Sequence, residues 1–255
     1  MTFVFFLFLL HGSLGLMAVL PVVPDRAGAK FFKFCTASAA FMTTAGWWLL
    51  WRRGGASPVL LWTTGAFLAL TVLYNRARHF DWRPALPPLL WAALGTGIAA
   101  VVAAEGPGAR AMLVATDLTS ALLLGAAAGA MILGHWYLVV LDLPITALRR
   151  LTVMLVLALI LRTIVVAAVM AGPAHAGLEP ARSVAAGLWS PDGVFVWMRL
   201  LFGIAGPLSL VWFIWKTVEI RSTQSATGIL YVQLFLVMAG ELLAKYLRVA
   251  AGIPL

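Results

Sequence analysis

The chain has 255 residues, of which 63% are hydrophobic and only 11% carry a formal charge. A soluble globular chain has about 25% charged residues, so this composition excludes a soluble fold and indicates a protein whose solvent is a lipid bilayer. The net charge of +9 comes from short segments between apolar stretches. Such a pattern indicates membrane topology and lipid contact, and it argues against nucleic-acid binding.

The single cysteine, Cys35, limits the cofactor chemistry that this chain can carry by itself. One thiol excludes an internal disulfide, and it also excludes a multi-cysteine iron–sulfur or zinc site within the chain. We therefore predict no metal site here, and any cluster that the system needs must lie in another subunit.

Eight apolar segments are each close to the roughly 20 residues that a helix needs to cross a bilayer. The first has no basic flank, so we expect a retained helix and not a signal peptide. A short amphipathic helix is expected at 180–188, in the longest loop. Together these features predict an all-α integral membrane protein, a bundle of about eight transmembrane helices in one polytopic domain over residues 1–255. The predicted spans are 2–23, 31–51, 58–74, 86–104, 111–140, 148–171, 195–215 and 226–250.

The fifth segment contains Gly125 and Gly129 with alanines between them. Small residues four apart let two helix backbones approach closely, so this face is predicted to pack against a neighbouring helix.

The distribution of Lys and Arg predicts the orientation of the bundle. The first, third, fifth and seventh loops hold ten basic residues, whereas the other loops hold four. Basic loops stay on the cytoplasmic side, so an even number of spans places both termini outside. We expect a multi-pass protein of a bacterial-type inner (plasma) membrane, although the pair Arg52 and Arg53 opposes this orientation.

Arg162 is the most informative residue, because it lies near the middle of an uninterrupted apolar stretch. A guanidinium at membrane depth costs at least about 2.5–3.5 kcal/mol, so a partner must compensate it. By helical rise, His11, Arg162 and Glu241 each lie roughly 13 Å inside the outer end of their helices. A shared polar site or an internal ion-pair network is therefore expected, with Glu241, Asp117 or the headgroup of a bound quinone as the partner of Arg162.

Three further charged groups lie nearer to the same end of the predicted helices. Asp117 is at a depth of about 9 Å, and Lys245 and Arg199 are at about 6–8 Å. They either join the polar site, or Arg199 and Lys245 extend to the headgroups while Asp117 caps a helix start. Glu241 and Lys245 are also four residues apart, so they can pair with each other.

Two histidines fall within predicted spans, His11 in the first and His135 toward the inner end of the fifth. Two such histidines can ligate a b-type haem if both reach one iron. Helical rise places His135 roughly 8 Å further inward than His11, which argues against a shared iron. Hydrogen-bonded packing roles are the alternative.

The C-terminal stretch from Ala239 to Leu247, followed by Ala251 and Gly252, resembles the closing helix of polysulfide-reductase-type (NrfD-like) membrane subunits. That helix usually has Arg where this chain has Lys245. The resemblance covers about twenty residues, and the span count matches smaller members of the family. It implies a quinone pocket on the outward side, to which a histidine of the first helix contributes, at the position of His11.

Residue chemistry is compatible with the same function. A quinol pocket needs a proton acceptor, a group to take the proton onward, and a cation to polarise a carbonyl. His11, Asp117 and Glu241 can move protons. Arg162, Lys245, Arg199 and His135 are the candidate cofactor-binding residues.

We therefore expect a membrane subunit of a multi-subunit respiratory or electron-transfer complex, which uses menaquinone or ubiquinone. Its partners would be other membrane subunits and an iron–sulfur protein or cytochrome. Two alternatives stay open. Charged groups at one depth also suit an ion, proton or small-solute transporter, and paired charges suit a purely structural subunit.

Overall fold

The computed structural model describes residues 1–106, 111–140, 143–171, 193–253 and 255. All regular structure in these residues is helical, which confirms the predicted all-α class. Short 3₁₀ turns lie in the connections: η1 (Leu20–Val22), η2 (Asp25–Ala27) and η3 (Arg83–Ala85). The main helices are α1 (Thr2–Val19), α2 (Ala29–Arg53), α3 (Pro58–His79), α4 (Leu86–Glu105), α5 (Ala111–Val139), α6 (Thr146–Ala171), α8 (Gly193–Leu200), α9 (Gly206–Glu219) and α10 (Thr223–Ala251).

Seven helical rods in the described residues are long and apolar enough to span a membrane, which makes this a multi-pass membrane protein. One of these rods is α8 and α9, joined by the π-helical turn η4 (Leu201–Ala205). Helix α2 has 25 residues but is less apolar. Its buried polar groups face α1, where Ser13 Oγ donates to Ala39 O at 2.9 Å and lies 2.5 Å from Thr43 Oγ1.

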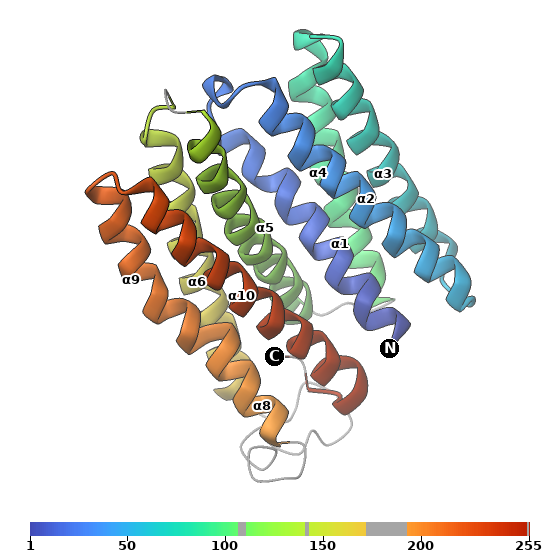
Figure 1. Cartoon of the computed structure of the whole chain (residues 1–255). Coiled ribbons are helices and arrows are strands. Elements are labelled where there is room, and N and C mark those ends of the chain that lie inside the picture. The colour runs from blue at the N-terminus through green and yellow to red at the C-terminus, as the bar shows by residue number, and fades with distance from the viewer. Residues whose placement is uncertain (107–110, 141–142, 172–192, 254) are drawn as a thin grey trace.

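Successive helical rods are antiparallel, and both termini lie at one end of the bundle (Figure 1). We call this the terminal end and the other the opposite end. Helix α1 is central. In its most apolar stretch of 18 residues, 72% of the residues are buried, against 22–56% in the corresponding stretches of the other six candidate spans. It packs against α2, α4, α5 and α10, and so joins the group α2–α4 to the group α5–α10.

The close contact between α1 and α5 depends on glycine, as the sequence predicted. A Cβ atom added at Gly125 would overlap the backbone of Gly15, and one added at Gly129 would lie 2.9 Å from Val19 Cγ2. A second close contact joins η4 to α10, where a Cβ at Gly240 would overlap the backbone of Gly203. Backbones that approach this closely leave no room for any side chain.

The third span was predicted to end at residue 74, but α3 continues to His79. Its last turn is held to α2 because Asn75 Nδ2 donates to Lys33 O at 2.9 Å and to Thr36 Oγ1 at 2.6 Å. Apolarity alone missed this polar turn. The amphipathic helix predicted at 180–188 lies outside the described residues.

Alanine substitutions at two glycines, one inside the α1–α5 contact and one outside it, test this contact. Gly125→Ala should destabilise the protein by about 1–3 kcal/mol, because the new methyl group meets backbone that cannot move aside. Gly95→Ala is the matched control, since a Cβ at Gly95 has no neighbour within 4 Å. The control should be neutral, or stabilising by up to about 1 kcal/mol through helix propensity. Thermal unfolding of the two purified variants in detergent measures the difference. Equal unfolding midpoints for the two variants would contradict the close α1–α5 contact.

Candidate functional site

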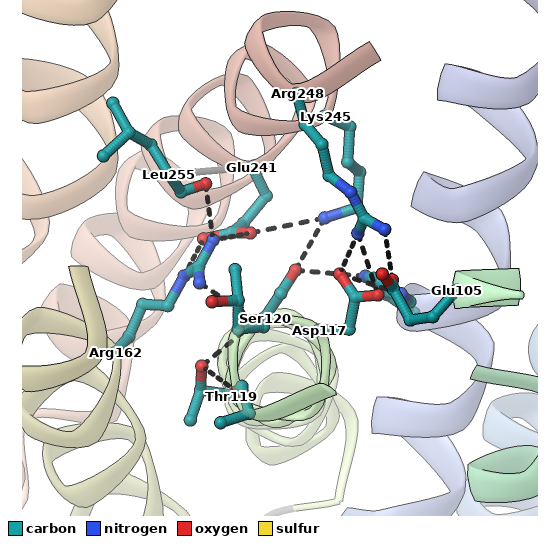
Figure 2. Close-up of polar contacts among 12 residues, drawn as sticks. Glu105, Asp117, Thr119, Ser120, Arg162, Glu241, Lys245, Arg248 and Leu255 are labelled. Atoms are coloured by element: carbon teal, nitrogen blue, oxygen red, sulfur yellow. Dashed lines mark hydrogen bonds and ion pairs between the residues drawn. The ribbon is translucent and has the colours of Figure 1, made fainter. Parts of the chain in front are cut away.

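Polar side chains from six helices meet inside the terminal half of the bundle. We call this group the ion cluster (Figure 2). Each member comes from a helix that is otherwise apolar. The ion cluster consists of His11 on α1, Glu105 on α4, Asp117 and Ser120 on α5, Arg162 on α6, Arg199 on α8, and Glu241, Lys245 and Arg248 on α10.

Glu241 is the centre of the ion cluster, and its carboxylate is fully buried. Arg162 binds it in a bidentate manner, with Nε 2.9 Å from Oε1 and Nη2 3.1 Å from Oε2. Arg199 Nη2 donates to Oε1 at 3.0 Å, and Lys245 Nζ donates to Oε2 at 3.3 Å. One carboxylate thus compensates cations from α6, α8 and its own helix.

Arg162 has a partner for every guanidinium nitrogen. Besides Glu241, its Nη1 donates to the Thr116 carbonyl at 2.9 Å and its Nη2 donates to the main-chain oxygen of Leu255 at 3.2 Å. Gly252, with a φ of +67°, ends α10 in the left-handed conformation, and Leu255 lies beside Arg162. These bonds explain how a guanidinium is held at this depth.

Ser120 joins Glu241 to the second carboxylate of the ion cluster. Lys245 Nζ donates to Ser120 Oγ at 2.6 Å, and His11 Nδ1 lies 3.3 Å from the same hydroxyl oxygen. The other ring nitrogen of His11, Nε2, lies 3.8 Å from Asp117 Oδ1. A continuous polar chain therefore runs from α6 to α1.

Asp117 and Glu105 share one cation. Arg248 Nη1 donates to both carboxylate oxygens of Asp117, at 2.7 and 2.9 Å, and its Nη2 pairs with Glu105. The Arg248 side chain is 16% exposed, unlike the fully buried Glu241. The ion cluster thus approaches the surface at the terminal end of the bundle.

The side chains of the ion cluster include more cations than carboxylates. The four cations are Arg162, Arg199, Lys245 and Arg248, and the three carboxylates are Glu105, Asp117 and Glu241. The main-chain oxygen of Leu255 is a further acceptor for Arg162.

Two members of the ion cluster keep buried polar atoms without a hydrogen-bond partner in the described part of the chain. These atoms are His11 Nε2, and Nε and Nη1 of Arg199. Both side chains are 0% exposed. Because a buried polar group without a partner is costly, such atoms indicate a bound water, ion or ligand.

The structure brings together six of the seven residues that the sequence singled out. The prediction that Arg162 is compensated by Glu241 is confirmed. The alternative in which Arg199 and Lys245 extend to the headgroups is wrong, because both side chains are buried and bind Glu241. Asp117 does not cap a helix start, since α5 begins six residues earlier at Ala111 and Asp117 pairs with Arg248.

His135 does not join the ion cluster. It is exposed near the opposite end of α5, where its Nδ1 lies 3.1 Å from the hydroxyl of Tyr231. His11 contacts Ser120, and fifteen residues of α5 separate Ser120 from His135, which is about 22 Å of helical rise. These two histidines are therefore too far apart to ligate one haem iron.

The sequence did not single out three members of the ion cluster: Arg248, Glu105 and Ser120. A signal existed for Arg248, because Glu241, Lys245 and Arg248 follow the i, i+4, i+7 spacing of one helix face. Its place near the end of a helix favoured a surface position instead. Within the described residues, no group of three His, Cys, Asp or Glu side chains can hold a metal ion.

Comparisons with known proteins found no significant match to a protein-family model, a curated protein or a solved structure.

Glu241→Gln tests the role of the central carboxylate. The variant keeps the shape of the side chain but leaves three buried cations without a counter-charge, so it should destabilise the protein by about 3–5 kcal/mol. Glu219→Gln is the matched control, because Glu219 pairs with Lys216 at 2.9 Å with both side chains more than half exposed. That pair should contribute no more than about 1 kcal/mol. Unfolding in mixed micelles measures both changes, and similar losses would contradict the central role of Glu241.

Proposed function

We propose that this chain is a membrane subunit of a multi-subunit electron-transfer complex, and that its ion cluster handles a quinone or quinol. The unsatisfied atoms of His11 and Arg199 carry this proposal. A quinone headgroup has two carbonyl oxygens that accept hydrogen bonds, and a quinol has two hydroxyl groups that donate them. Arg199 offers free donors, and neutral His11 offers an acceptor through Nε2 when its proton is on Nδ1.

The residues of the ion cluster suit the proton side of this chemistry. Oxidation of a quinol releases two protons and two electrons. His11 Nε2 accepts a proton from a bound hydroxyl, and Asp117 at 3.8 Å stabilises the imidazolium that forms. Asp117 and Glu105, both held by Arg248, then provide carboxylates toward the terminal end of the bundle. Arg199 stabilises negative charge on the oxygen that loses its proton.

The electrons require a partner. The single cysteine does not suffice for an iron–sulfur cluster, and His11 and His135 are too far apart to share a haem. We therefore propose an iron–sulfur or cytochrome subunit next to the terminal end, where the ion cluster lies. The resemblance of α10 to NrfD-like subunits supports this assignment, because the resembling stretch includes Glu241 and Lys245.

A second candidate function is a proton or ion path through the chain itself. It is favoured by the continuous polar chain from Arg162 to the partly exposed Arg248. Vesicles that contain only this chain distinguish the two functions: quinone handling predicts no proton or ion flux without partners, whereas a path predicts flux.

Substitution of His11 tests the quinone proposal. In the purified native complex, His11→Gln should lower quinol-dependent electron transfer by about 10²-fold or more, because glutamine does not accept the proton. His135→Gln, a change of the exposed histidine near the opposite end, should leave turnover unchanged. Labelling with an azidoquinone, competed by excess quinone, should mark α1, α5 or α8 in the native complex. A folded His11→Gln complex with normal turnover would refute the proposal.

The basic loops support a bacterial-type inner (plasma) membrane orientation in which the opposite end of the bundle faces the cytoplasm. Cys35 is buried, so single Ser→Cys variants give a clean test. Ser57 lies at the terminal end before α3, Ser225 lies at the opposite end in the first turn of α10, and both are exposed. Ser57→Cys should react with an impermeant maleimide in intact cells, and Ser225→Cys only after permeabilisation. The reverse pattern would invert the proposed orientation.

A further inference from the structure

A groove of about 720 Å³ runs along α6 from Thr146, at the opposite end of the bundle, to Leu161, the residue before Arg162 of the ion cluster. Val22, at the end of the η1 turn after α1, and Leu122 on α5 form one wall, and α6 forms the rest. The contribution of α6 is Thr146, Arg149, Arg150, Val153, Met154, Leu157 and Leu161.

The lining of the groove changes from basic to apolar along α6. Arg149 and Arg150 lie in the first turns of the helix, and the side chains from Val153 to Leu161 that follow are all apolar. From Arg149 to Leu161 the helix rises about 18 Å, comparable with the length of a lipid acyl chain. This arrangement fits a ligand with a negative head and a long apolar tail.

The positive charge at the head of the groove extends beyond the arginine pair. Arg149 also lines a neighbouring pocket with Arg221, Trp215 and Glu219, and its guanidinium stacks 5.5 Å from the centre of the Trp215 ring. Glu219 is already paired with Lys216 at 2.9 Å. Among the described residues, no carboxylate lies within ion-pair distance of Arg149 or Arg150.

We propose that this groove is a binding site for one anionic phospholipid. Arg149 and Arg150 bind the phosphate, and an acyl chain lies along Val153, Leu157 and Leu161. Two observations select this occupant: the apolar part of the groove opens to the side of the bundle, where lipid tails surround the helix, and two adjacent arginines sit at headgroup level. Basic pockets between transmembrane helices bind acidic headgroups through the same chemistry.

The chain provides a matched control for this site. Arg52 and Arg53 form a second adjacent pair, exposed at the end of α2, at the terminal end of the bundle. Variants Arg149→Gln with Arg150→Gln, and Arg52→Gln with Arg53→Gln, therefore remove the same charge from the two ends. A ligand that binds only the folded state raises the thermal midpoint as its concentration increases. Folding of each variant is verified from its midpoint in detergent without added lipid.

The experiment titrates the purified full chain in neutral detergent with phosphatidylglycerol or, separately, phosphatidylcholine. Phosphatidylglycerol should raise the midpoint of the unmodified chain and of the Arg52/Arg53 variant, and native mass spectrometry should show one retained lipid. The Arg149/Arg150 variant should bind roughly 30-fold more weakly, from about 1 kcal/mol per basic residue. Equal stabilisation by phosphatidylcholine, equal losses in both variants, or a groove covered by a partner subunit in the purified complex would each overturn the proposal.

Discussion

The pairing of one carboxylate with three cations constrains the terminal half of this protein. Glu241 holds Arg162 on α6, Arg199 on α8 and Lys245 on its own helix. In a hydrocarbon environment none of these cations has water as an alternative, so each depends on Glu241 and on the few carbonyl or hydroxyl oxygens beside it. Three helices are thereby fixed in depth and rotation by one side chain, and replacing Arg162 and Glu241 together would still leave two cations without a counter-charge.

Close helix packing makes this pairing geometry possible. Gly15 and Gly125 let the backbones of α1 and α5 approach, and the same contact brings His11 next to Ser120 and Asp117. On the other side, Gly203 and Gly240 let η4 approach α10, and the guanidinium of Arg199 occupies the space beside Gly203. Small residues therefore do more than tighten the bundle, because they set where the polar groups meet.

The two ends of the bundle have different chemistry. Carboxylates, cations and a histidine lie buried in the terminal half, whereas the opposite end has arginines next to an apolar groove. The polar groups at the two ends therefore have different roles in a bilayer. Buried polar groups serve a reaction or hold the bundle together, whereas basic groups at headgroup level interact with lipid. The fully buried donors of Arg199 and the free Nε2 of His11 belong to the first kind.

The sequence by itself determined the membrane class, the helical segments to within a few residues and the position of each charged group along its helix, because length, hydropathy and a fixed rise per residue need no partner. It also required that Arg162 be compensated, since a guanidinium keeps its charge. Only the tertiary structure decided which groups meet: Glu241 with Arg162, Arg248 with Asp117, Arg199 inside and His135 outside. Helices that are apolar on nearly all sides show no stripe that reveals which face turns inward. Depth is one coordinate that a sequence provides, but rotation and adjacency come from packing.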